Sequence, residues 1–375
     1  MKKIQCIFIL LLTSYAAIAQ VEKWQKGIVS QEFLYEKAPF PSCHSATLAE
    51  TQSGLVAAYF GGTKERDPDV EIYVSRMVDG KWLPPVSVAD GVQANAKRLP
   101  TWNPVLYQVP NGELLLFYKI GPKPSEWWGM MKTSKDGGKT WSPAIKLPEG
   151  YIGPVKNKPI LLSNGNLLAP SSKEGNGWKL HFEISNDFGK TWRMIGPLDG
   201  NGINAIQPSI LQHGNGKLQL LARTQNRAIA QAWSIDNGET WTPLTKTTLP
   251  NNNSGTDALT MKDGRHLLIY NHVLPPGDLA KGPRTPLNVA ISKDGEHWSA
   301  ALILEDSPIS QYSYPAVIQT SDGLLHFIYT WRREKIKHVV VDPAKLKLKK
   351  IKKGVWPALK GYAAPEIKET KNEEG

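Results

Sequence analysis

The stretch PFPSCHSATLAE, residues 39–50, places Cys43 and His44 directly ahead of a short apolar run. A histidine titrates near neutral pH, so it can donate or accept a proton during catalysis. Near the other end of the chain, SQYSYPAVI carries Tyr312 and Tyr314, whose phenol groups can transfer protons or attack an electrophile. These residues lie far apart in the chain, so the fold must bring them together.

A repeated turn motif shows how the chain is organised. SKDGGKTW (134–141), SNDFGKTW (185–192) and SIDNGETW (234–241) share S-x-D-x-G-x-T-W, while SKDGEHW (292–298) is shorter and SRMVDGKW (75–82) is degenerate. Their tryptophans recur every 49 to 59 residues. In such a box the aspartate accepts hydrogen bonds from turn amides, glycine supplies a positive φ, and tryptophan packs between neighbouring units. The boxes are therefore predicted to be structural.

A second series of segments lies between the boxes, each a turn dipeptide followed by an apolar strand. The segments are SGLVAAYFGG, NGELLLFYKI, NGNLLAPSS, GNGKLQLLAR, DGRHLLIYNH and DGLLHFIYTW. Six units result, with about four strands per 50 residues, and no stretch with helical periodicity competes. This pattern predicts an all-β fold, a six-bladed β-propeller.

Each unit opens with a further strand that is expected to line the central channel: CHSATL, WNPVLY, NKPILL, IQPSIL, GTDALT or SYPAVI. Aligned on a shared small residue or proline, the six strands place one residue each at the same mouth of the channel: His44, Asn103, Lys158, Gln207, Thr256 and Tyr314. Strand alternation adds the residues two positions earlier, including Tyr312 and Lys156, to that face. So polar a set favours a ligand-binding cavity over a closed polar network.

The N-terminus, MKKIQCIFILLLTSYAAIAQ, has two lysines, an apolar run and a small-x-small cleavage pattern. We expect residues 1–19 to be a signal peptide and residues 20–375 a single propeller domain, exported by a bacterium to the periplasm or the medium. Cys43 is then the one remaining cysteine, which excludes an internal disulfide. No later run approaches the roughly 20 apolar residues of a membrane helix. A monomer is expected.

The chain is basic, with a formal charge of +11, or about +9 once Lys2 and Lys3 leave with the signal peptide. Six lysines lie in AKLKLKKIKK (344–353), where alternation predicts an exposed edge strand ahead of the C-terminal tail. A positive net charge in a sequence without nucleic-acid-binding motifs favours an acidic glycan as the partner. The eight histidines show no metal-ligand spacing, so neither a metal nor another cofactor is expected.

Over nearly all of residues 25–340 the chain resembles the sialidase superfamily of Asp-box propellers. GPRTPLNVAISKDGEHW is similar to the segment that carries one arginine of the sialidase carboxylate-binding triad, which implies that role for Arg284. LLARTQNRAIAQAWSIDNGETW is similar to the segment that carries another arginine of this triad. The resemblance implies that role for Arg223 or, as the alternative, Arg227.

The same resemblance implies roles in catalysis. SQYSYPAVIQTSDGLLHFIY looks like the segment with the nucleophilic tyrosine, which maps to Tyr312, with Tyr314 as a second catalytic candidate. GGTKERDPDVEIYVSR resembles the loop of the acid/base aspartate, which maps to Asp69 or, as the alternative, Asp67.

Two departures from the sialidase pattern count against the sialic-acid reaction. Sialidases open with an Arg-Ile-Pro motif whose arginine completes the triad, and Cys43 or His44 stands at that position here. The position of the glutamate that activates the tyrosine is taken by Gln207. A neutral amide cannot take a proton from a phenol. The chain resembles a divergent sialidase-like branch that shares CHSATL, YFGGT, GPVKNKPILL and SGTDALTMKDGR.

These residue types favour an enzyme that acts on the non-reducing end of uronic-acid oligosaccharides by β-elimination, as a lyase or a dehydratase. Arg223, Arg284 and Gln207 would stabilise the charge that develops on the carboxylate as the C5 proton leaves. His44 or a tyrosinate would remove that proton, and the other would protonate the leaving oxygen. In residue type this set resembles propeller polysaccharide lyases.

Two alternatives stay open at this point. The first is a retaining glycosidase with Tyr312 as nucleophile and Asp69 as acid/base. The second is a glycan-binding propeller without catalysis. In each case the substrate-binding candidates are Arg223, Arg284, Gln207, Lys158, Asn103 and Arg227.

Overall fold

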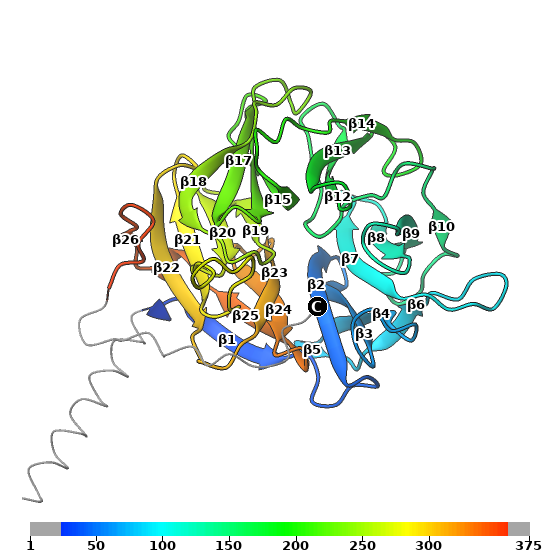
Figure 1. Cartoon of the computed structure of the whole chain (residues 1–375). Helices are drawn as coiled ribbons and strands as arrows, with labels where there is room; N and C mark the ends of the chain where they lie inside the picture. Colours follow the sequence, from blue (N-terminus) through cyan, green and yellow to red (C-terminus); the bar gives the residue numbers. More distant parts are fainter. Residues whose placement is uncertain (1–23, 359–375) are drawn as a thin grey trace, which may run out of the picture.

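Six antiparallel sheets surround a central axis in the structure, a computed structural model that describes residues 24–358 (Figure 1). This arrangement confirms the predicted all-β, six-bladed propeller. The predicted signal peptide and the end of the C-terminal tail lie outside the described residues. Within residues 24–358, no helix is long and apolar enough to cross a membrane.

The first three blades follow one another along the chain. Blade 1 contains β2 (Ser42–Thr51), β3 (Gly54–Gly62), β4 (Glu71–Val78), β5 (Lys81–Trp82) and β6 (Val86–Ala89). Blade 2 contains β7 (Thr101–Gln108), β8 (Leu114–Ile120), β9 (Trp128–Ser134) and β10 (Ile145–Lys146). Blade 3 contains β11 (Ile160–Leu161), β12 (Leu167–Lys173), β13 (Lys179–Ser185) and β14 (Arg193–Ile195).

The other three blades include both ends of the described chain. Blade 4 contains β15 (Ala205–Gln212), β16 (Leu218–Thr224), β17 (Ala228–Ser234) and β18 (Thr245–Pro250). Blade 5 contains β19 (Asp257–Thr260), β20 (His266–Tyr270), β21 (Leu287–Ser292), β22 (Trp298–Glu305) and β26 (Lys349–Lys350). Blade 6 contains β23 (Tyr312–Gln319), β24 (Leu325–Trp331), β25 (Lys335–Val341) and β1 (Ile28–Phe33).

The ring is closed by the N-terminal strand. β1 pairs antiparallel with β25, so the first strand of the described residues is the outermost strand of the last blade. After a 3₁₀ turn at Pro343–Lys345, β26 pairs with β22 at the edge of blade 5, and both of its lysines are exposed. The predicted lysine-rich edge strand is thus present, although it is only two residues long.

The Asp boxes are turns between the outer strands of the blades, as their pattern predicted. In the box of blade 3, Asp187 Oδ1 accepts hydrogen bonds from the backbone N–H groups of Lys190 and Thr191 at 3.0 and 2.8 Å. The box tryptophan of blade 4, Trp241, stacks on Phe182 of blade 3 with ring centroids 4.5 Å apart. The boxes therefore stabilise turns and join neighbouring blades.

A β-bulge interrupts four of the innermost strands, β2, β7, β15 and β23, at corresponding positions. At each bulge one residue has a positive φ: Ser45 (58°), Asn103 (32°), Gln207 (58°) and Tyr314 (51°). The residue of blade 1 that corresponds to Tyr314 is therefore Ser45, whereas the sequence alignment had used His44. An extra residue on one strand also shifts the alternation of side chains, which two-residue spacing cannot anticipate.

Candidate active site

Several of the candidate site residues lie close together at one end of the propeller. The innermost strands β2, β15 and β23 begin there, and the second strands of the blades, including β3, β16 and β24, return to it. We call five residues at this end the axial cluster: His44, Gln207, Arg223, Arg284 and Tyr314. The Asp boxes lie at the opposite ends of the strands.

Tyr314 is at the centre of the axial cluster. Its hydroxyl oxygen accepts hydrogen bonds from Arg223 Nη1 at 2.8 Å and from Gln207 Nε2 at 3.0 Å. Both partners are donors, and neither a guanidinium nor an amide nitrogen can take the phenol proton. Neither Arg223 nor Gln207 can therefore act as a base for Tyr314.

His44 lies against Tyr314, with ring centroids 4.1 Å apart, and its Nδ1 is 2.9 Å from Thr330 Oγ1. The imidazole is only 2% exposed. Burial, followed by the positive charges of Arg333 and Arg284, lowers the pKa of His44 well below 6.5. His44 is thus a neutral hydrogen-bonding group at pH 7, and its environment disfavours the imidazolium that a general base would become.

This low pKa predicts how activity and stability depend on pH. We expect kcat/KM to show no inflection from His44 near pH 6.5. Because unfolded histidine binds a proton below its ordinary pKa while folded His44 does not, the contribution of His44 to stability falls as pH drops below 6.5. Histidine ring NMR shifts would follow its titration directly. An acid limb centred near pH 6.5 that disappears in His44→Asn would contradict the assignment.

Two arginines of the cluster face Tyr314 with part of their hydrogen-bonding capacity unused. Arg223 Nε donates to Asn253 Oδ1 at 2.9 Å, and its guanidinium packs over the ring of Trp178 at 5.1 Å. Arg284 lies 5.7 Å from the centroid of the Tyr314 ring. Within residues 24–358, Nη2 of each arginine has no hydrogen-bond partner. Two such groups can bind a carboxylate.

Lys156 lies below the Tyr314 ring, 5.7 Å from its centroid, and is 3% exposed. Its ammonium group donates to Asn157 Oδ1, Thr256 O and Pro315 O at 2.7–2.9 Å. Burial lowers its pKa to about 7. A Cβ on Gly255 would come within 3.0 Å of Lys156 Cε, so glycine allows this close approach. Lys156 thus joins blades 3, 5 and 6 beneath the site.

Tyr312 does not belong to the axial cluster. It is 1% exposed and packs in the hydrophobic core with Leu287 and Tyr329. Its hydroxyl makes one long contact, 3.4 Å, with Arg332. The bulge at Tyr314 separates the two tyrosines, so Tyr312, the predicted nucleophile, lies in the core, while Tyr314, the second catalytic candidate, lies in the axial cluster.

Three further predicted site residues are engaged elsewhere. Lys158 forms an ion pair with the buried Asp257 at 2.7 Å. Arg227 donates to the carbonyl oxygens of Pro275 and Gly277, both at 2.9 Å, and so supports a loop of blade 5. Asp69 caps its own exposed loop by accepting from Thr63 N and Oγ1 at 2.9 and 2.7 Å. Asn103 is buried at the bulge of β7.

The structure adds charged residues that sequence reasoning missed. Arg333, in the turn between β24 and β25, donates from Nε to Gln311 Oε1 at 2.8 Å and from Nη1 to Glu65 of the β3–β4 loop. Glu174 follows β12, and burial raises its pKa. The signal in the sequence was the pair of successive arginines in TWRREK, directly after the apolar segment DGLLHFIYTW. Within residues 24–358, no three metal-binding side chains are grouped as a metal site requires.

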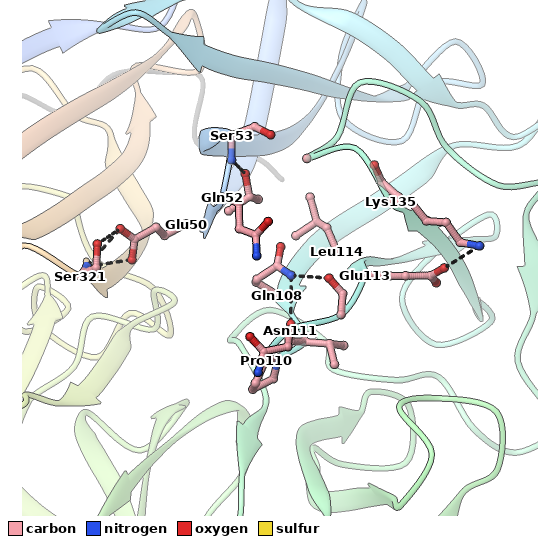
Figure 2. A pocket seen from close by; sticks show the side chains of 15 residues that line it. Glu50, Gln52, Ser53, Gln108, Pro110, Asn111, Glu113, Leu114, Lys135 and Ser321 are labelled. Atoms are coloured by element: carbon pink, nitrogen blue, oxygen red, sulfur yellow. Dashed lines mark hydrogen bonds and ion pairs between the residues drawn. The ribbon is translucent and has the colours of Figure 1, made fainter.

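A groove of about 600 Å³ opens at the other end of the propeller (Figure 2). It lies between the β2–β3, β7–β8 and β23–β24 turns, where Glu50 accepts hydrogen bonds from Ser321 and Lys135 lies 3.6 Å from Glu113. Since strands β2, β7 and β23 start at the axial cluster and end at these turns, the groove is separate from the site.

Comparison with known proteins agrees with the fold. The sequence profile of the BNR repeat-like domain matches residues 53–327. A Macrobdella decora protein named anhydrosialidase is 24% identical over 241 residues, which cover 55% of this chain and 30% of that protein. The match thus spans less than a third of the length of that relative.

Solved structures share the architecture at low sequence identity. A Dyadobacter fermentans protein of unknown function superposes with a TM-score of 0.68 at 19% identity, covering 84% of this chain and 99% of that one. The intramolecular trans-sialidase of Ruminococcus gnavus gives a TM-score of 0.65 at 17% identity, covering 86% and 99%. At these identities the likeness supports the fold alone.

Proposed function

The chain belongs to the BNR repeat-like domain family and is a sialidase-superfamily propeller, and from this premise we propose that it is a carbohydrate-active enzyme that cleaves acidic oligosaccharides by β-elimination. The observation that carries the proposal is the Tyr314 oxygen, which accepts hydrogen bonds from Arg223 and Gln207 and faces no carboxylate partner among the described residues. The predicted signal peptide would place the reaction outside the cytoplasm.

The substrate carboxylate would bind to Arg223 and Arg284. Like-charge crowding supports this role, because burial and the neighbouring Arg333 lower the pKa of Arg284 to about 10. Arg284 still stays charged at neutral pH, and a bound anion would relieve the repulsion between the guanidinium groups. As the proton leaves C5 of a uronate, negative charge spreads onto its carboxylate, where these two groups would stabilise it.

Tyr314 would transfer the proton. In its deprotonated form, with the charge stabilised by Arg223 and Gln207, the phenolate takes the C5 proton and becomes neutral. The C5 electron pair then forms the C4–C5 double bond as the C4–O bond breaks, and the Tyr314 proton passes to the leaving oxygen. Atoms and charge balance without water or a cofactor. Neutral His44 packs against the Tyr314 ring and holds it in place.

Hydrolysis through a tyrosyl intermediate fits the geometry less well. A retaining hydrolysis needs a second acid/base group besides the nucleophile. The predicted acid/base Asp69 lies in an exposed turn and bonds to Thr63. Elimination needs only one group that takes a proton beside a bound carboxylate and returns it to the leaving oxygen, and Tyr314 alone can do both.

One assay distinguishes these reactions. The protein is incubated with uronic-acid oligosaccharides and, separately, with a sialoside, and both absorbance near 235 nm and product mass are recorded. Elimination gives an unsaturated product that absorbs and has gained no water. Release of free sialic acid, or a uronate product heavier by one water, would instead establish hydrolysis. The absence of any product, together with measurable sugar binding, would favour a glycan-binding propeller.

A further inference from the structure

The turn between β24 and β25 has an unusual backbone for its sequence. Arg332 and Arg333 both have a positive φ, 53° and 62°, and the turn is closed by a hydrogen bond from Glu334 N to Trp331 O. Asn and Gly are the usual residues in two successive left-handed positions, because a long side chain is disfavoured there. Such local strain is maintained where the side chains have a role.

The two arginines point to different places. Arg332 packs over the ring of Trp331 at 4.5 Å and contacts Ser307 Oγ at 3.3 Å, away from the axial cluster. Arg333 instead meets blade 1, where Cys43 N donates to its carbonyl oxygen at 2.8 Å. This backbone bond fixes the turn beside His44, at the position where the sialidase-like sequence pattern lacks its first arginine.

Gln311 places the guanidinium of Arg333 next to that of Arg284. Its Oε1 accepts from Arg333 Nε at 2.8 Å and from Arg284 Nη1 at 3.3 Å. One neutral oxygen thus holds two cations together. Burial, followed by the positive charge of Arg333, lowers the pKa of Arg284.

Arg333 is paired with a carboxylate of the protein itself. Arg333 Nη1 forms an ion pair with Glu65, whose side chain is 23% exposed. Burial alone would raise the pKa of Glu65, but Arg333 and then Arg284 lower it overall, so Glu65 is ionised. The guanidinium is therefore built to bind a carboxylate, and its present partner sits on a loop at the surface.

We propose that Arg333 is part of the site for the sugar carboxylate, and that Glu65 occupies Arg333 in the free protein and gives it up when an acidic sugar binds. The proposal rests on the proposed function in taking the ligand to be a sugar carboxylate, and it is independent of the reaction that follows. The ion pair between blades 6 and 1 then lowers affinity for the ligand.

Calorimetric titration with D-glucuronate and with N-acetylneuraminate tests this exchange, with D-glucose as the uncharged control. Arg333→Gln is expected to weaken binding of the preferred acidic sugar about 10- to 100-fold, because a charge-assisted hydrogen bond is lost. Glu65→Gln is expected to tighten it about 3- to 10-fold, since the competing carboxylate is removed. A gain in affinity cannot arise from misfolding.

Lys335→Gln is the matched control. Lys335 follows the same turn and forms an ion pair of 2.9 Å with Glu36, so it also joins the last blade to the N-terminal region. The affinity of the Lys335→Gln variant for the acidic sugar should match that of the wild type. Unchanged affinity in both Arg333→Gln and Glu65→Gln, or a wild type that binds neither acidic sugar, overturns the proposal. Binding that depends on Arg333 without unsaturated product would overturn elimination alone.

Discussion

Replacing Tyr314 by phenylalanine is expected to lower kcat on an acidic oligosaccharide by about 10²- to 10⁴-fold, the usual contribution of a positioned proton-transfer group. The ring, and with it the contact to His44, is retained, while the oxygen that accepts from Arg223 and Gln207 is lost. Initial rates of unsaturated product formation at saturating substrate measure the effect. Circular dichroism melting shows whether the variant is folded.

Tyr312→Phe is the matched control for this prediction. It removes a hydroxyl whose one contact is at 3.4 Å, from a side chain buried in the core. We expect kcat to stay within about twofold of the wild type, since no group of the axial cluster changes. Loss of activity in Tyr312→Phe with retention in Tyr314→Phe would restore the assignment made from sequence.

Replacing Asp257 by alanine is expected to destabilise the propeller by about 3–5 kcal/mol, because it removes one partner of a buried, hydrogen-bonded ion pair. Asp257 is 1% exposed. Its carboxylate accepts from Lys158 Nζ of blade 3 at 2.7 Å, from Ser209 Oγ of blade 4 at 3.1 Å and from Val317 N of blade 6 at 2.9 Å. Urea unfolding measures the loss.

Two further variants separate this buried pair from an ordinary ion pair. Lys158→Met should cost less than Asp257→Ala, because Asp257 keeps its bonds to Ser209 and Val317. Glu239→Ala breaks the exposed pair with Arg193 and should change stability by about 0–1 kcal/mol. Equal losses in Asp257→Ala and Glu239→Ala would show that Asp257 does not join the blades.

The architecture could be predicted because its signals are local. Each Asp box forms a turn from residues within about eight positions, and the spacing of the boxes reports the length of a blade. The apolar strand after each turn dipeptide was likewise readable, and these segments are the second strands β3, β8, β12, β16, β20 and β24. Local hydrogen bonding and hydrophobic pattern were sufficient to predict a six-bladed ring.

By itself, the sequence determined the all-β ring and its structural boxes. It named His44, Gln207 and Tyr314 as candidates for the site, whereas Arg223 and Arg284 were named from the sialidase resemblance. Only the tertiary structure placed Tyr314 in the axial cluster and Tyr312 in the core, because a single extra residue in a bulge shifts strand alternation without a clear sequence pattern. It also brought Arg333 to Glu65, 268 positions apart in the chain. Closure of the ring places the last blade beside the first. A contact between these two blades cannot be predicted from a local sequence pattern.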